Sequence, residues 1–227
     1  MSLAYIQALI DDLARDQGEV LSADARTRAL EAARLQYSVD RPRVLVEDIA
    51  WASGNLAPVP SIWTESVWIK SAEYPIGREP ASLIDVAPYR SPEGWHLLAA
   101  TPVQAGDLVR VTFMADHQLT ELVDTIPVVH RLAVAQYAAH LLCHQLATYY
   151  SAQRETMLGS DASVTETRAR EFAARSKELR TAYYIGVGLA DPFKASGGSS
   201  AAGSAAAGVV SWPSNNPRHR LVHRGEL

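Results

Sequence analysis

The sequence has little of what stabilises or anchors a secreted or membrane protein. It contains one cysteine, Cys143, which cannot form an intramolecular disulfide and suits a reducing compartment. Its most apolar region, 132–146, is interrupted by Gln136, His140 and His144, and is too short and too polar to cross a bilayer. The first residues lack the basic segment and the continuous apolar stretch of a signal peptide. We therefore expect a protein that has no membrane partner and is present in the cytoplasm when it is made.

The sequence also lacks a basic excess. Its net charge of −4 argues against a dedicated nucleic-acid-binding protein, which would normally carry more lysine and arginine than acid. What it does have is 48% hydrophobic and 20% charged residues, a composition typical of a globular protein rather than a disordered one. Its 227 residues are enough for one large domain or two small ones.

The common catalytic signatures are absent as well. No G-x-S-x-G elbow or Walker lysine occurs, and the glycines of 186–191 follow a predicted helix, whereas a dinucleotide-binding loop follows a strand. A catalytic thiolate needs partial exposure and a lowered pKa, but Cys143 is surrounded in sequence by leucines. The sequence therefore predicts neither an enzyme nor a cofactor.

Two features leave an alternative open. His140 and His144 are four residues apart on one helical face and could share a zinc ion, but Leu141 stands where a metalloprotease helix has its glutamate. No third ligand cluster is evident, so we predict no metal and interpret both histidines as packing groups.

Aromatic residues of a β segment can also bind sugars or bases, although they more often fill a small core. The four tryptophans that fall in the predicted β segment are Trp51, Trp63, Trp68 and Trp95. The alternative function is thus a cytoplasmic metal-dependent hydrolase or small-ligand-binding protein.

The first 42 residues have the pattern of two helices. Leu3, Ile6, Ile10 and Leu13 recur at helical spacing and mark the buried face of the first helix. Ser22 is a candidate N-cap for a second helix over about 23–37, which should end before Pro42 because the residue preceding a proline disfavours helical geometry. This second helix is expected to bury a four-residue face: Ala29, Leu30, Ala33 and Tyr37.

Short β-rich runs follow. Five of them, between Arg43 and Ala115, are separated by turn-forming residues, and 88–96 reads as a hairpin. We expect an antiparallel module of four or five strands inserted between helices.

A long helix is then predicted from Pro127, with Thr125 as a possible cap, and a last helix over about 165–185. The helix after Pro127 is apolar nearly all round, so it should be surrounded by neighbours. The predicted fold class is α+β, with a four-helix bundle-like core, an inserted antiparallel β module and an extended C-terminal tail. The expected boundaries are 1–42 and 120–190 for the helical core, 43–119 for the β module, 191–208 for a flexible linker and 209–227 for a docking tail.

The last 19 residues differ in kind from the linker rich in glycine, serine and alanine that precedes them. A disordered terminus is usually poor in hydrophobic residues, whereas tryptophan and arginine dominate interface hot spots. The tail is therefore a candidate partner-binding segment, and its three arginines against Glu226 predict an acidic partner surface. The predicted partner-binding residues are Val209, Val210, Trp212, Pro213, Arg218, Arg220, Leu221 and Arg224.

The sequence "SADARTRALEAARLQYSVDRPRVLVEDI" (22–49), followed by a tryptophan-containing β segment, resembles the head–tail connector adaptor proteins of long-tailed bacteriophages. "IPVVHRLAVAQYAAHLLCHQLATYYSAQ" (126–153) and the later "AYYIGVGL" (182–189) are similar to their C-terminal helical pair. The resemblance rests on helix order and on the Y-S-x-D-x-P turn at 37–42, and it covers most of residues 1–190.

This resemblance implies a structural virion protein at the head–tail junction, which is present in the host cytoplasm during assembly. Its implied partners are further copies of itself in a ring, typically of twelve, the portal protein, and a neck or tail-completion protein (stopper or tail terminator). Genomic DNA would pass through the ring without specific contacts, which suits an acidic chain. In several such adaptors the C-terminal segment extends from the helices and docks on the portal.

Overall fold

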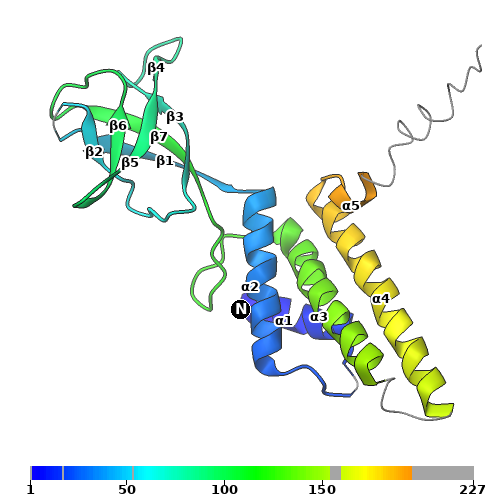
Figure 1. The fold of residues 1–227 in the computed structure, drawn as a ribbon. Helices are drawn as coiled ribbons and strands as arrows, with labels where there is room; N and C mark the ends of the chain where they lie inside the picture. Colours follow the sequence, from blue (N-terminus) through cyan, green and yellow to red (C-terminus); the bar gives the residue numbers. More distant parts are fainter. Residues whose placement is uncertain (1, 17, 53, 154–159, 196–227) are drawn as a thin grey trace, which may run out of the picture. The chain divides into compact units, whose positions relative to one another are not determined.

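The structure is a computed structural model that describes residues 2–16, 18–52, 54–153 and 160–195. It divides into two compact units, Met1–Val187 and Gly188–Leu227, and each is described by itself. The first unit combines helices with two antiparallel sheets (Figure 1). Its helical elements are α1 (Ser2–Ala14), α2 (Ala23–Asp40), the 3₁₀ helix η1 (Val128–His130), α3 (Arg131–Gln153) and α4 (Ser160–Val187).

Helix α2 begins where the sequence predicts. The backbone of Ser22 is extended, and its hydroxyl accepts a hydrogen bond of 3.1 Å from the backbone N–H of Ala25, which satisfies one of the free donors at the helix start. The helix continues three residues beyond the predicted end, to Asp40, immediately before Arg41 and Pro42. The predicted inward face is confirmed, because all four of its residues are buried: Ala29, Leu30, Ala33 and Tyr37.

Helix α3 is the central helix of this unit. It contacts α1, α2 and α4, and Figure 1 shows it between α2 and α4. The sequence predicts that this helix, which is apolar on nearly all faces, has neighbours on several sides, and its contacts with three other helices confirm that prediction. The predicted cap is wrong: Pro127 occupies the N-cap of η1 without a side-chain hydrogen bond, whereas the Thr125 hydroxyl accepts from the backbone N–H of Gln118 at 2.8 Å.

Helix α4 runs antiparallel to α3 and turns one side toward the helical core. Ala169, Ser176, Leu179 and Tyr183 are buried, and Phe172 is half-buried. A Cβ placed on Gly186 would lie 3.1 Å from the Cβ of Ala133, so glycine permits the close approach of the two backbones. Gly188, with φ +74°, follows the last helical residue, as a left-handed C-terminal cap requires.

The β segment forms an antiparallel module of two sheets. The strands are β1 (Arg43–Ala50), β2 (Leu56–Pro58), β3 (Trp68–Glu73), β4 (Leu83–Ile84), β5 (Val86–Ser91), β6 (Gly94–Ala99) and β7 (Leu108–Ala115). One sheet has the order β1-β7-β3-β4, and the other has the order β2-β6-β5. The expected hairpin at 88–96 is the β5–β6 pair, with Ser91 opposite Gly94.

The expected number of four or five strands is wrong, since the described residues contain seven. Strands β2 and β4 have three and two residues, too few for an alternating pattern to be recognised. One of the five β-rich runs, 82–89, is divided at Asp85 into β4 and β5, because the chain passes there from the first sheet into the second. The two sheets share one apolar core that includes Trp51, Leu97 and Phe113.

In the second unit, Pro192–Ala195 form the short helix α5, within the span expected to be a linker. None of the helices described by the structure is long and apolar enough to cross a membrane.

Candidate functional site

The partner-binding residues predicted from the tail, Val209, Val210, Trp212, Pro213, Arg218, Arg220, Leu221 and Arg224, lie outside the described residues. The structure therefore does not test that prediction. The candidate sites that it does describe are in Met1–Val187.

His140 and His144 lie on α3, but their surroundings differ. Nδ1 of His140 lies 2.8 Å from the Ser176 hydroxyl and 2.9 Å from the Ser176 carbonyl oxygen, and its ring contacts Tyr137 edge-on. His144 is exposed. Within the described residues, no group of three or more His, Cys, Asp or Glu side chains could hold a metal ion. His140 thus joins α3 to α4, consistent with a packing role.

Cys143 is completely buried between α3 and α4, in a cluster with Ala139 and Leu179. Burial raises the pKa of its thiol to about 11, because removal from water penalises the thiolate. A thiol in this environment stays protonated at neutral pH and is shielded from reagents, which fits the prediction that it packs rather than reacts.

The four tryptophans of the β segment have different roles. Trp51 fills the core, 1% exposed, and its indole N–H donates to the Gly54 carbonyl oxygen at 3.1 Å. Trp63 and Trp95 are half-buried with ring centroids 5.9 Å apart, and the guanidinium of Arg90 lies over Trp95. Trp68 is 67% exposed on the outer face of β3. The four side chains therefore do not converge on one ligand pocket.

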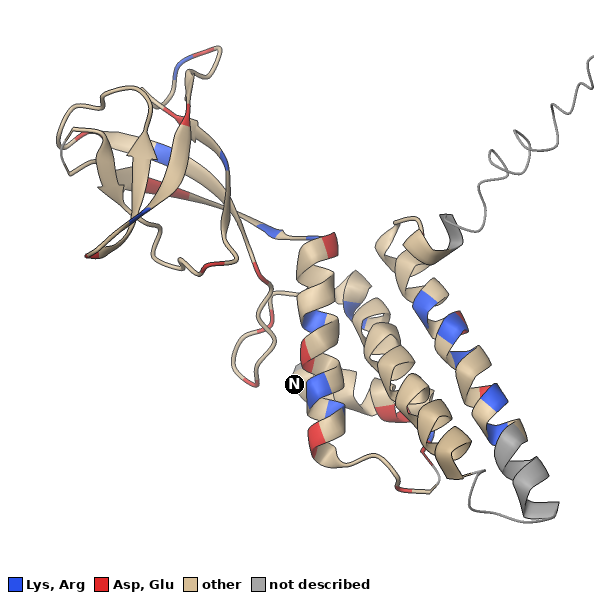
Figure 2. Cartoon of the chain, in the orientation of Figure 1, with Lys and Arg blue, Asp and Glu red and all other residues tan. Residues whose placement is uncertain are grey.

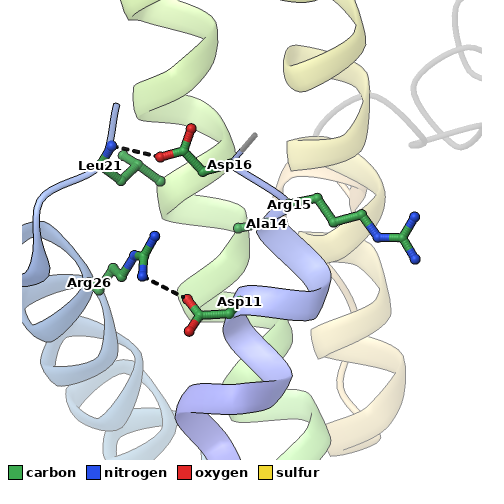
Figure 3. A pocket seen from close by; sticks show the side chains of 6 residues that line it. All are labelled: Asp11, Ala14, Arg15, Asp16, Leu21 and Arg26. Atoms are coloured by element: carbon green, nitrogen blue, oxygen red, sulfur yellow. Dashed lines mark hydrogen bonds and ion pairs between the residues drawn. The ribbon is translucent and has the colours of Figure 1, made fainter. Parts of the chain in front are cut away.

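A pocket of about 390 Å³ lies where α1 meets the start of α2 (Figure 3). Its charged groups are engaged with neighbouring groups: Asp11 forms an ion pair with Arg26 at 3.3 Å, and Asp16 accepts from the backbone N–H of Leu21 at 2.7 Å. Figure 3 shows the side chain of Arg15 pointing away from these groups. The ion pair links α1 to α2, and the Asp16 hydrogen bond lies within the connection between them.

A buried histidine joins the two connections between the helices and the sheets. The backbone N–H of His117 donates to the Ser38 hydroxyl at 2.9 Å. Its ring nitrogens lie 2.9 Å from the Arg41 carbonyl oxygen and 3.0 Å from the Thr125 carbonyl oxygen. The ring also packs against Tyr37, with centroids 4.9 Å apart. His117 therefore fixes the end of α2 and the segment before α3 at the same point.

The end of α2, the start of α3 and the end of α4 are joined by three further contacts. The Tyr37 hydroxyl lies 2.6 Å from Nδ1 of His130, the Tyr183 hydroxyl donates to the Asp40 carboxylate, and the Arg41 guanidinium donates to the Val187 carbonyl oxygen at 2.8 Å. Burial, reinforced by the Asp40 carboxylate, raises the pKa of Tyr183 far above its usual value, so the hydroxyl remains a donor.

Apolar side chains are exposed at these joined helix ends. We call Val39, Val128, Val129 and Ile185 the apolar end group, and they are 76%, 73%, 79% and 73% exposed. Each lies within two residues of one of the contacts that join the helix ends. Highly exposed aliphatic side chains near several helix ends are candidates for contact with another molecule. The apolar end group is the strongest candidate functional surface among the described residues.

Charge is unevenly distributed along the chain (Figure 2). Residues 43–124 include eleven acidic and five basic side chains, whereas residues 167–187 of α4 include five basic and two acidic ones. Lys and Arg accordingly follow one another along α4 in Figure 2. The segment 43–124 is thus net acidic, mostly through the loops between its strands, whereas residues 167–187 of α4 are net basic.

Sequence reasoning identified neither the role of His117 nor the apolar end group. His117 has no periodic signal, since its partners are backbone groups 76 and 8 residues away in sequence. In the end group, Val128 and Val129 belong to a run that is apolar on all sides, so periodicity does not distinguish exposed from buried residues.

No protein-family model matches the chain, and no curated protein matches it. Among solved structures, a chain of the "Neck of empty GTA particle computed with C6 symmetry" aligns with 59% of this chain and 74% of its own length. GTA stands for gene transfer agent. The alignment has 18% sequence identity and a TM-score of 0.25. These values establish neither a family nor a function for this chain.

Proposed function

We propose that the protein is a structural, non-enzymatic adaptor subunit that forms a ring at the neck of a virus-like particle. In this proposal the four long helices form a four-helix bundle. The ring joins the portal of the head to a stopper or tail-terminator protein. The observation that carries the proposal is the apolar end group, whose four aliphatic side chains are each at least 73% exposed.

Burial of such side chains explains why a subunit would associate. Removing a valine or isoleucine side chain from water contributes about 1.5–3 kcal/mol, so several at one contact supply a substantial part of a stable interface. The hydrogen bonds among Tyr37, His130, Tyr183 and Asp40 hold the helix ends in place before association. A preorganised surface loses less conformational entropy when it binds.

The tail and the charge of the chain fit the same role. Residues 209–227 would dock on the portal through Trp212, with their arginines facing an acidic surface. The net charge of −4 suits a ring through which DNA slides without tight phosphate contacts. The sequence resemblance to phage head–tail adaptors, carried by 22–49 and 126–153, favours this assignment over other homo-oligomeric proteins.

The experiment is assembly of the purified chain with the portal protein encoded by the same genome, measured by sedimentation. We expect Val128→Asp combined with Val129→Asp to abolish the complex, because two charges would be buried at the contact. Val46→Asp, at a residue 58% exposed on β1, is the matched control and should assemble normally. Unimpaired assembly of the double variant would contradict the proposed surface. Stoichiometric zinc in the purified protein would instead favour the hydrolase alternative.

A further inference from the structure

A basic pocket of about 440 Å³ lies between α3, α4 and the residues that follow α1. We call it the arginine pocket. The residues that α4 contributes to it recur at spacings of three, one and three, which places them on one helical face. The charged residues around the pocket are Arg15, Arg168, Glu171 and Arg175. Three guanidinium groups against one carboxylate leave an excess of two positive charges.

The three arginines have no acidic partner. None of them forms an ion pair with any residue of the described ranges, and neither does the exposed Glu171. The guanidinium of Arg168 lies over the ring of Tyr150, 5.9 Å from its centroid. Arg15 makes a long hydrogen bond of 3.3 Å to the Asp12 carbonyl oxygen. Like charges around one cavity repel one another, so the pocket favours a bound anion that balances them.

One wall of the arginine pocket carries a hydrogen-bond donor that lacks a partner. Tyr150 is 9% exposed, and its ring stacks on Phe172 with centroids 5.6 Å apart. No group in the described part of the chain forms a hydrogen bond with its hydroxyl. A Cβ placed on Gly18, another lining residue, would lie 3.2 Å from that hydroxyl oxygen and crowd it. The hydroxyl is therefore held beside the pocket and is available to a ligand.

Arg15 has a backbone conformation that is unfavourable for arginine. It follows the last residue of α1 with φ +44°, in the left-handed region where helices commonly end on glycine. Figure 3 shows its side chain turned away from Asp11 and Asp16. Residues held in such conformations cluster at binding sites, where the strain is tolerated for the sake of the side chain.

We propose that the arginine pocket binds a phosphate group that carries two negative charges, either free inorganic phosphate or a phosphate monoester. Guanidinium groups present planar forks of donors that match phosphate oxygens. A phosphate monoester carries about −1.5 to −2 charges at pH 7, which matches the excess in the pocket, whereas a carboxylate or a phosphodiester carries a single charge. The Tyr150 hydroxyl donates to a further phosphate oxygen. This site does not depend on the ring-forming function.

The test is isothermal titration calorimetry of the full chain at low ionic strength, with inorganic phosphate, adenosine monophosphate and adenosine as probes. We expect saturable binding of the two probes that carry phosphate and none of adenosine. The first two probes also distinguish the sources of the phosphate group. Equal affinities identify free phosphate as the ligand, and tighter binding of adenosine monophosphate identifies a monoester.

Substitutions assign the binding to this pocket. Arg168→Gln and Arg175→Gln should each weaken phosphate binding on the order of 10- to 100-fold, the loss expected for one charge-assisted hydrogen bond. Tyr150→Phe keeps the ring and its stacking, and should weaken binding about 3- to 10-fold. Arg15→Gly should weaken binding on the order of 10-fold without lowering the unfolding temperature, because glycine relieves the strain. Lys177→Gln, at an exposed residue of α4 outside the pocket, removes the same charge and should bind like the parent.

Three outcomes would overturn the inference: no saturable phosphate binding, unchanged binding when Arg168→Gln and Arg175→Gln are combined, or an equal loss in Lys177→Gln. Adenosine that binds as tightly as adenosine monophosphate would also overturn it, because the phosphate would then not be recognised. The unfolding temperature of each variant without ligand separates loss of the site from loss of the fold. The ring-forming function stands or falls on the apolar end group instead, so failure of one proposal leaves the other in place.

Discussion

The buried residues that the sequence singles out pack against neighbours and form hydrogen bonds within the folded chain. Cys143 is buried between α3 and α4, His140 bonds to Ser176, and Trp51 fills the core between the sheets. Among the described residues, the large hydrophobic side chains that are more than 70% exposed are those of the apolar end group and Leu122. At the scale of the residue, these observations support the proposed role as an interaction protein.

The pH dependence of stability tests the role assigned to Cys143. Its thiol has a pKa near 9 when exposed and about 11 when folded, so between these values the unfolded chain releases a proton that the folded chain retains. The free energy of unfolding should therefore fall as pH rises from 9 to 11, by up to about 2–3 kcal/mol from this group. Denaturant titrations should show a shallower fall for Cys143→Ala than for the parent. An equally steep fall in both would show that the thiol is not the titrating group.

At the scale of the element, the helices and the sheets are joined through a few specific contacts. The two connecting segments, 41–42 and 116–127, meet at His117, which bonds to the backbone on both sides. The ends of α2, α3 and α4 are joined next to it by Tyr37 and Tyr183. These contacts fix the helix ends that carry the apolar end group.

Replacement of His117 should destabilise the chain more than replacement of a histidine within a sheet. His117→Ala leaves the Arg41 and Thr125 carbonyl oxygens without this partner and opens space beside Tyr37, so we expect a loss of about 2–4 kcal/mol in the free energy of unfolding. His96→Ala, at a half-buried residue of β6, is the control and should cost about 1 kcal/mol or less. Urea denaturation measures both, and equal losses would contradict the role of His117.

The sequence predicts the elements that local patterns of residues are sufficient to determine. The cap at Ser22, the buried face of α2 and the β5–β6 hairpin follow from local patterns, and the structure has all three. Strands β2 and β4 could not be predicted, because a two- or three-residue strand is determined by the strand that pairs with it. The apolar end group could not be predicted either, since which face of an apolar run stays exposed depends on where the neighbouring helices end.

At the scale of the whole molecule, the described part presents a preorganised surface, and the sequence beyond it carries a predicted docking segment. Residues 209–227 are separated from α5 by a stretch dominated by glycine, serine and alanine. Under the proposed function, a linker of this composition would give the tail reach to a partner.

Deletion of residues 209–227 should separate folding from assembly. The truncated chain should unfold at the same temperature as the full chain, because no residue of the helical or strand cores is removed. It should fail to join the portal complex, and Trp212→Ala should weaken joining by on the order of 2 kcal/mol, as expected for a hot-spot aromatic residue. Thermal melts and sedimentation with the portal provide the two readouts. Normal joining by the truncated chain would show that the tail is dispensable.

The central claim is that copies of this chain close into a ring around the path of the DNA. Electron cryomicroscopy of the full chain assembled with the portal protein of the same genome tests it most directly. The account predicts a closed ring of equivalent copies, with the apolar end group buried at a protein contact. Copies bound singly, without contact between them and with the apolar end group in solvent, would contradict it.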